Sequence, residues 1–297
     1  MSSWLPDSLA DFGPAALAAL MVGGYLVLGE PFVGWVLHRR FESAVGTAPG
    51  ARRWLYRRLL LLEWGLVVLV VAVLVVAPRV GGAELGLRWP DRVSVATGVV
   101  VLAILLVTVA SVRALRGGAI RDAGSESAAL RSVGSLLPRS ASERRLFGAV
   151  AVTAGIAEEV VYRGFGIAVL AALAPALPWW GLIAAAGAGF GVAHAYQGLA
   201  GILTTGLLGS VLAAVYLDTG SLLVPVLLHA LIDLRFLAVP ADVLPPSQAQ
   251  VDLAAADPAI TDPAITDPAT SDSRRRPPDT GEPGTHDTRP IDFGQRP

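Results

Sequence analysis

The sequence predicts an all-α polytopic membrane protein: a transmembrane helix bundle of about seven spans, followed by a disordered C-terminal tail. Two observations support this fold class. Hydrophobic residues make up 54% of the 297 residues and charged residues only 16%, whereas about a quarter of the residues in a soluble domain are charged. Several apolar runs also approach twenty residues, which is the length of a helix that spans a bilayer.

The composition also narrows the chemistry. The chain has no cysteine, which excludes disulfides, thiolate metal ligands and a cysteine nucleophile. Its formal net charge is −1, and it has no basic patch interleaved with aromatic residues, so no nucleic-acid partner is expected. The partner that the composition predicts is the lipid bilayer.

Seven apolar spans follow one another along the chain, and each is expected to form a helix. Their approximate bounds are Ala15–Val36, Leu59–Ala77, Val93–Val112, Phe147–Leu173, Trp180–Tyr196, Leu199–Leu217 and Leu222–Leu237. The last two are short for a span, and Gly198 and Gly201 mark a tight junction at the start of the sixth.

Arginine is distributed unevenly over the first three loops. The first loop carries six arginines and the third carries seven, whereas the second carries three, offset by Glu84 and Asp91. Because short cytoplasmic loops are enriched in basic residues, the first and third loops are predicted to be cytoplasmic. Seven spans then leave the N-terminus outside and the C-terminal tail in the cytoplasm, in an integral protein of a prokaryotic plasma membrane.

Three regions are predicted on this basis. Residues 1–143 form an N-terminal three-span region with arginine-rich cytoplasmic loops, and residues 144–238 form a core of four spans. After about Pro240 the chain contains the repeat "DPAITDPAITDPAT" and is rich in Pro, Asp and Thr. Such a segment cannot bury enough apolar surface to offset the entropy of ordering. Residues 239–297 are therefore predicted to be a disordered cytoplasmic tail.

The fourth span contains "GIAEEVVYRGF", in which three ionisable residues interrupt an apolar helix. An ionised residue at mid-membrane raises the free energy of insertion by roughly 2.5–3.5 kcal/mol, and an apolar residue lowers it by only about 0.3–0.6 kcal/mol. Glu159 and Arg163 are four residues apart, in the order that favours an ion pair. Glu158 is rotated by about 100° from Glu159 and is expected to project free into a bundle interior or a water-filled cavity. The alternative is that all three residues only pin helices together.

Two later spans carry further polar residues. "FGVAH" places Phe190 and His194 four residues apart on one helix face, and "HALID" does the same for His229 and Asp233. The remaining two histidines are expected in a loop and in the tail (His38 and His286). A lone histidine in a membrane helix usually only bonds to a neighbouring helix. Two of them, with an aspartate and an adjacent glutamate pair, favour a functional site instead.

These residues allow two kinds of hydrolytic site. In one, Glu158, His194 and His229 hold one divalent metal, for which zinc is the first candidate, with an open position for water. In the other, Glu158 is the general base on a water that it polarises together with His194, and His229 and Asp233 donate hydrogen bonds to the oxyanion. The donor role needs a protonated Asp233 carboxyl; an ionised one orients His229 or binds metal. No other cofactor is expected.

Together the motifs "EEVVYR", "FGVAH" and "HALID" resemble the CPBP family of intramembrane proteases, which includes the CAAX prenyl endopeptidases and the Abi or bacteriocin-processing proteins. The resemblance covers about residues 144–235. It implies that Glu158 activates water with His194 and that His229 and Asp233 complete the site. The supporting residues that it implies are Glu159, Arg163 and Phe190. Family members resemble either zinc metalloproteases or glutamate-type enzymes with a histidine and asparagine oxyanion hole. Asp233 stands in place of that asparagine, which slightly favours metal ligation.

The function expected from these observations is an intramembrane endopeptidase, either a metallo- or a glutamate-type peptide hydrolase. Its substrate is a membrane protein or membrane-associated peptide, and whether that substrate is lipidated stays open because fold and motif fix chemistry better than substrate. Two alternatives use the same polar cluster. One is a proton or ion transporter, against which the absence of internal repeats in the sequence argues. The other is a non-catalytic immunity or scaffold protein.

Overall fold

The computed structural model describes residues 4–45, 48, 50–116, 134–240 and 244, and the statements below concern these residues. They contain helices and no strand, which confirms the all-α class. The described helices belong to one compact unit within residues 1–249. The predicted tail lies outside the described residues, except at positions 239, 240 and 244.

The seven predicted spans correspond to seven helical segments of the described chain. Four of these segments, the first, the fourth, the sixth and the seventh, each join two or more elements without a break. In chain order the elements are η1 (Leu9–Ala15), α1 (Ala16–Gly24), η2 (Tyr25–Gly29), α2 (Glu30–Val45), α3 (Ala51–Val76), α4 (Val95–Arg116), η3 (Gly134–Leu136), α7 (Ala141–Glu158), η4 (Glu159–Gly166), α8 (Ile167–Leu173), α9 (Trp179–Ala193), η5 (Ala195–Gln197), α10 (Gly198–Thr219), α11 (Leu223–Leu234) and η6 (Arg235–Ala238).

Four helical segments of the described chain are long and apolar enough to cross a membrane. They are Leu9–Val45, Ala51–Val76, Val95–Arg116 and Ala195–Thr219. Helix α9 is apolar but shorter, and the segment from α7 to α8 carries the buried charges that the sequence assigns to the fourth span. The chain is therefore an integral membrane protein of the polytopic class.

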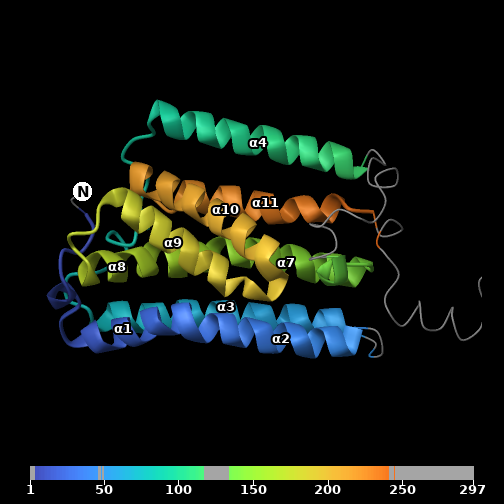
Figure 1. Ribbon diagram of the computed structural model, residues 1–297, viewed down its shortest axis with the longest axis horizontal. Coiled ribbons are helices and arrows are strands. Elements are labelled where there is room, and N and C mark those ends of the chain that lie inside the picture. The colour runs from blue at the N-terminus through green and yellow to red at the C-terminus, as the bar shows by residue number, and fades with distance from the viewer. Residues whose placement is uncertain (1–3, 46–47, 49, 117–133, 241–243, 245–297) are drawn as a thin grey trace, which may run out of the picture. The chain divides into compact units, whose positions relative to one another are not determined.

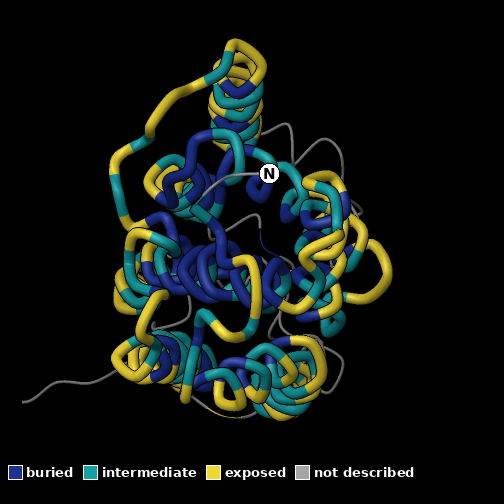
Figure 2. Tube along the Cα trace, turned by 90° about the vertical axis from the view of Figure 1, so that its left-hand side faces the viewer, coloured by how far each residue is buried: buried dark blue, intermediate teal, exposed yellow. Residues whose placement is uncertain are grey.

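The helices of this unit are arranged in layers (Figure 1). Helices α1, α2 and α3 lie on one side, α7, η4 and α8 run through the middle, and α11 packs on the opposite side of α7 with α4 beyond it. Figure 2 looks along the bundle: the buried segments gather at its centre and α4 is largely exposed. The segment with the Glu pair is thus the central one.

The first arginine-rich loop is shorter than the sequence predicts. Helix α2 continues to Val45, so His38 lies on this helix and its predicted position in a loop is wrong. The helix extends because residues 37–45 contain neither Gly nor Pro. In addition, His38 Nε2 lies 3.2 Å from Glu42 Oε1 one turn later.

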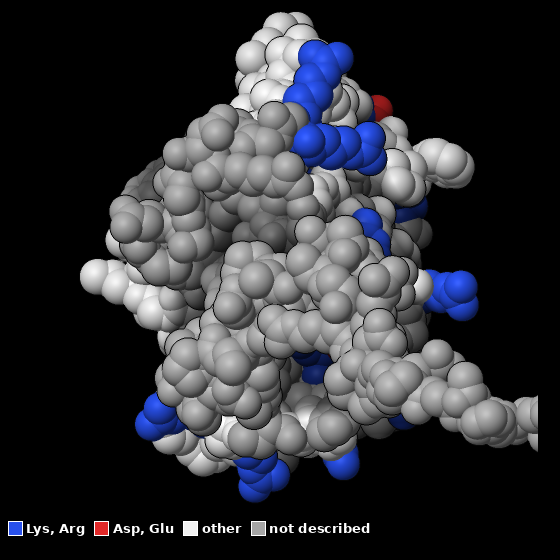
Figure 3. Space-filling model, turned by 90° about the vertical axis from the view of Figure 1, so that its right-hand side faces the viewer, with Lys and Arg blue, Asp and Glu red and all other residues white. Residues whose placement is uncertain are grey.

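Arginine side chains gather at one end of the unit, the end seen in Figure 3. They come from the C-terminal half of α2, from the last turn of α4 and from the N-terminal parts of α3 and α7. At the opposite end, arginine is paired with acid: Arg88 Nη2 lies 2.9 Å from Asp91 Oδ2, and Arg79 Nη1 lies 3.6 Å from Asp11 Oδ1. By the positive-inside rule the arginine-rich end would be the cytoplasmic one, and the orientation stays a prediction.

Helices α9 and α10 approach each other closely at small residues. A Cβ added at Gly191 would lie 2.5 Å from the carbonyl oxygen of Ile202 on α10, and one added at Gly187 would lie 2.8 Å from that of Gly206. Because glycine lets the two backbones meet, the end of α9 and the residue that follows it, His194, are held firmly against α10.

Gly191→Ala is expected to lower the midpoint of thermal unfolding in detergent, because the new methyl group must push α10 away. Overpacking of this kind costs about 1–3 kcal/mol. Gly189→Ala is the matched control on the same helix, since no described atom lies within 4 Å of a Cβ at that position. Equal stability of the two variants would contradict the close approach.

Candidate active site

The segment that carries the Glu pair changes its helical winding at the site. Helix α7 ends at Glu158, and the next eight residues, Glu159–Gly166, form the π-helix η4. The sequence suggests an ordinary α-helix here, and the wider turn is a finding of the structure. π-Helical turns are rare and occur frequently at functional sites.

Glu159 and Arg163 form the predicted ion pair. Arg163 Nη1 donates to Glu159 Oε1 at 2.9 Å, and both side chains are fully buried, with 0% exposure. The guanidinium carbon of Arg163 also lies 4.1 Å from the ring centroid of Phe190 on α9. The ion pair therefore connects η4 to α9 through a cation–π contact.

His229 joins this network from α11. Its Nδ1 donates to Glu159 Oε1 at 2.7 Å, so that one carboxyl oxygen accepts from both Arg163 and His229. Its Nε2 faces Glu158 Oε2 at 3.8 Å and Asp233 Oδ2 at 3.7 Å. Gly155 permits the approach of α11, because a Cβ there would lie 2.8 Å from the backbone nitrogen of Ala230.

Glu158 stays outside the ion pair, as the sequence predicts. Its side chain is 21% exposed, and its Oε2 has no hydrogen-bond partner among the described residues. His194, directly after α9, lines the same pocket. The Nδ1 of His194 lies 2.9 Å from the carbonyl oxygen of Phe190 and donates to it. In the neutral ring Nε2 is then an acceptor.

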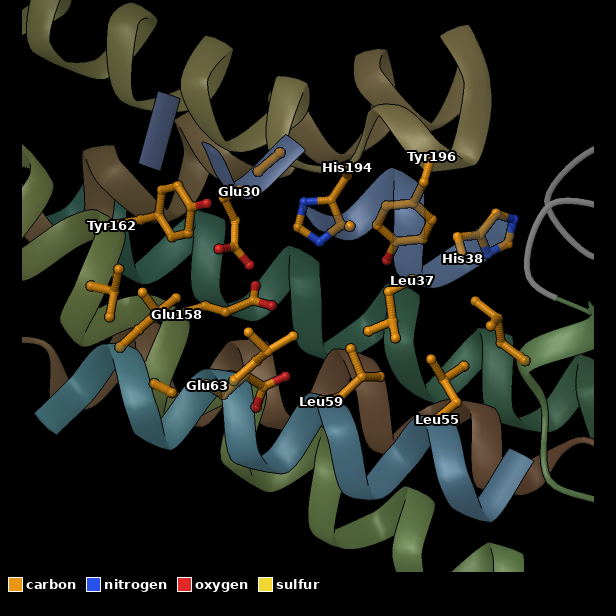
Figure 4. Close-up of a pocket in the computed structure, with 17 residues that line it drawn as sticks. Glu30, Leu37, His38, Leu55, Leu59, Glu63, Glu158, Tyr162, His194 and Tyr196 are labelled. Carbon is orange, nitrogen blue, oxygen red and sulfur yellow. The ribbon is translucent and has the colours of Figure 1, made fainter. Parts of the chain in front are cut away.

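The pocket lies between α2, α3, α7 and the end of α9 (Figure 4), with about 820 Å³ of empty space. About 100 Å³ of this space can hold the centre of a water-sized sphere, whereas one water needs about 10–15 Å³ by the same measure. The pocket therefore has room for several waters or for a short stretch of a peptide chain beside Glu158.

Four polar residues of this pocket are missed by the sequence analysis: Glu30, Glu63, Tyr162 and Tyr196. The carboxyl groups of Glu30 and Glu63 point into the pocket near that of Glu158 (Figure 4), and one oxygen of each has no hydrogen-bond partner among the described residues. A signal for both glutamates exists in the sequence, because each is an ionisable residue inside an apolar span. Glu30 also directly follows η2, the other π-helix of the described chain.

An apolar corridor leads from the carboxyl groups toward the arginine-rich end. Leu37, Leu55 and Leu59 line it, with His38 and Tyr196 farther along (Figure 4). Glu63 and Leu55 are eight residues apart on α3, which corresponds to about 12 Å of helix. A substrate that enters from the arginine-rich end would pass these leucines before it reaches Glu158.

A metal centre at this site would need three or more donor side chains grouped around one point. Among the described residues, no three His, Cys, Asp or Glu side chains are grouped as metal ligands. Glu159 already occupies one ring nitrogen of His229, and the Phe190 carbonyl occupies one of His194. Zinc ligation by Glu158, His194 and His229 stays a prediction of the sequence.

Residues 142–235 match the family model of the Type II CAAX prenyl endopeptidase Rce1-like proteins. The matched region contains all three motifs and confirms the family resemblance that they indicate. It leaves α1 to α4 outside, and these include the two helices that bring Glu30 and Glu63 to the pocket. A comparison with curated proteins found no match, and a comparison with solved structures found none.

Arg163→Ala is expected to lower the yield of folded protein sharply, because it leaves the Glu159 carboxylate buried without its arginine. Breaking a buried pair in this way costs about 3–5 kcal/mol. Adding Glu159→Gln to Arg163→Ala should restore part of the yield, since the unpaired charge is then absent. Size-exclusion profiles in detergent measure both, and a stable Arg163→Ala single variant would contradict the role given to this pair.

Proposed function

We propose that this chain is an intramembrane endopeptidase, similar to CAAX proteases, that hydrolyses a peptide bond in a membrane-associated protein or peptide. One observation carries the proposal: Glu158 and the free nitrogen of His194 share a pocket with room for water, while the buried network around Glu159 fixes the helices that surround it. The family match over residues 142–235 supports the same chemistry.

In the proposed reaction a water molecule lies between Glu158 and His194. Nε2 of His194 accepts a hydrogen bond from this water and orients it. Glu158 takes a proton from the water as the water oxygen attacks the carbonyl carbon of the substrate. The carbon–nitrogen bond of the tetrahedral intermediate then breaks, and Glu158 returns the proton to the leaving amine. Glu158 thus acts first as a base and then as an acid.

The oxyanion of the intermediate is stabilised in this proposal by His229 and Asp233. Glu159 occupies Nδ1 of His229, so His229 donates from Nε2 when both ring nitrogens carry protons. The Asp233 side chain is 32% exposed, and it donates when its carboxyl is protonated. Such donors contribute about 2.7–4 kcal/mol each in other hydrolases.

The substrate proposed for this site approaches from the cytoplasmic side. The lining leucines Leu37, Leu55 and Leu59 lie on the arginine-rich side of Glu158, and the positive-inside rule assigns that end to the cytoplasm. This apolar lining suits a hydrophobic peptide segment. A prenylated substrate, which the name of the matched family specifies, is one candidate of this kind.

Glu158→Gln is expected to abolish cleavage while leaving membrane insertion intact, because the amide cannot accept the proton from water. The loss should be about a hundredfold or more. The measurement is a mass-spectrometric comparison of protein termini in membranes of cells that make the wild type or the variant at matched levels. Asp91→Asn, a similar change at the end opposite to the arginine-rich one, serves as the control.

New termini near membrane edges that occur with the wild type and with Asp91→Asn, but not with Glu158→Gln, would establish the protease and identify its substrates. The same termini with Glu158→Gln would eliminate this residue as the base. No difference among the three membranes would favour the transporter and scaffold alternatives.

Asp233→Asn is expected to retain cleavage within a few-fold, because the amide always offers an N–H donor where the carboxyl must first be protonated. Asp233→Ala should lose about a hundredfold, since the donor is gone. Both are assayed in membranes on a substrate identified as above. An inactive Asp233→Asn protein would instead make the ionised carboxylate essential, as a partner of His229 or of a metal.

A further inference from the structure

A second hollow lies between α2 and α3, beside the active-site pocket. It has about 950 Å³ of empty space, and its lining comes from one face of each helix. The lining residues are Phe32, Val33, Val36, Leu37, Arg40, Trp54, Arg58, Leu61 and Leu62. We call this hollow the α2–α3 groove. It plays no part in the proposed hydrolysis.

The α2–α3 groove is apolar along most of its length and positively charged at its arginine-rich end, which we call its mouth. Arg40 and Arg58 are its only charged lining residues among those described, and both lie at the arginine-rich end. Arg58 stacks over Trp54, with 5.7 Å from the guanidinium carbon to the ring centroid. In Figure 3 arginine side chains project outward along the lower edge, over the ends of α2 and α3. Tryptophan and arginine together are typical of the interface between lipid and water.

The apolar part of the α2–α3 groove faces laterally, toward the lipid. Phe32 is 63% exposed and Leu61 is 70% exposed. Phe32 and Arg40 are eight residues apart, which gives the groove about 12 Å along α2. Its lining offers only Trp54 and the two arginines as side-chain donors and no side-chain acceptor. An extended peptide backbone in the bilayer needs such partners along its whole length, whereas an acyl chain needs none.

We propose that the α2–α3 groove binds an anionic phospholipid of the cytoplasmic leaflet. Arg40 and Arg58 hold the phosphate of its headgroup, and an acyl chain lies along Phe32, Val36 and Leu61. Charge complementarity identifies this occupant, because both charges at the mouth are positive and no acidic residue lines the groove. Basic residues at a membrane surface attract anionic lipid by about 1 kcal/mol each.

The bound lipid would also form part of the wall of the active-site pocket. Leu37 and Leu62 line both the α2–α3 groove and the pocket that contains Glu158. An acyl chain in the groove packs against the outer side of these two leucines. The lipid site is thus separate from the reacting groups, but it lies one side chain away from the space where a substrate would lie.

The test uses the full-length protein in a neutral detergent, titrated with phosphatidylglycerol or with phosphatidylcholine, and bound lipid is counted by native mass spectrometry. We expect the wild type to retain phosphatidylglycerol in preference to phosphatidylcholine. The double variant Arg40→Gln/Arg58→Gln should bind phosphatidylglycerol about thirtyfold more weakly, since two attractions of about 1 kcal/mol are lost. Val36→Trp, which fills the apolar part, should lose the lipid while keeping both charges.

The matched control is Arg39→Gln/Arg57→Gln, two exposed arginines that precede the lining ones on the same helices and do not line the groove. This variant should bind phosphatidylglycerol as the wild type does. An equal loss in the control would mean attraction by diffuse surface charge and would overturn the proposal. Equal retention of the two lipids by the wild type would overturn the proposal as well. The midpoint of thermal unfolding is also measured with each ligand, and a shift by inorganic phosphate as large as that by phosphatidylglycerol would overturn the proposal too.

Discussion

The rest of the site depends on the two contacts that Oε1 of Glu159 makes. This oxygen accepts from Arg163 within η4 and from His229 on α11, and Arg163 in turn stacks on Phe190 of α9. A buried charge that loses its partner costs several kcal/mol, so none of these elements can shift without a large penalty. The relative positions of η4, α9 and α11 are thereby fixed by one carboxylate.

This network leaves Glu158 free, which is what a reactive carboxyl needs. The two glutamates are adjacent in the chain, yet Glu159 is fully buried in ion pairs, whereas Glu158 lines the pocket and its Oε2 accepts no hydrogen bond from a described residue. Half of the pocket wall comes from α2 and α3, outside the matched region. In the proposed reaction the motifs of the matched region supply the reacting groups, and the N-terminal helices line much of the pocket around them.

Much of this architecture could be predicted from the sequence, because its causes are local. Apolar run length predicts the seven helical segments, and the i,i+4 spacing predicts the pair of Glu159 and Arg163. What the sequence does not predict depends on packing between distant segments. The π-helical turn at Glu159 has no periodicity signal of its own in eight residues, and Glu30 and Glu63 become part of the site only when α2 and α3 pack beside α7. The helical position of His38 is missed for a different reason, because polar residues that follow an apolar span are typical both of a loop and of a helix that extends beyond the bilayer.

The number of acidic groups at the site has a physical consequence for its hydration. Glu30, Glu63, Glu158 and Asp233 lie in or beside the pocket, and the one arginine of the network is already paired with Glu159. Like charges so close together in a dry, low-dielectric interior would be strongly unfavourable, so the pocket must retain water or the carboxyls must hold protons. Where the pocket retains water, the same water that makes the acidic cluster tolerable is the second reactant of the proposed hydrolysis.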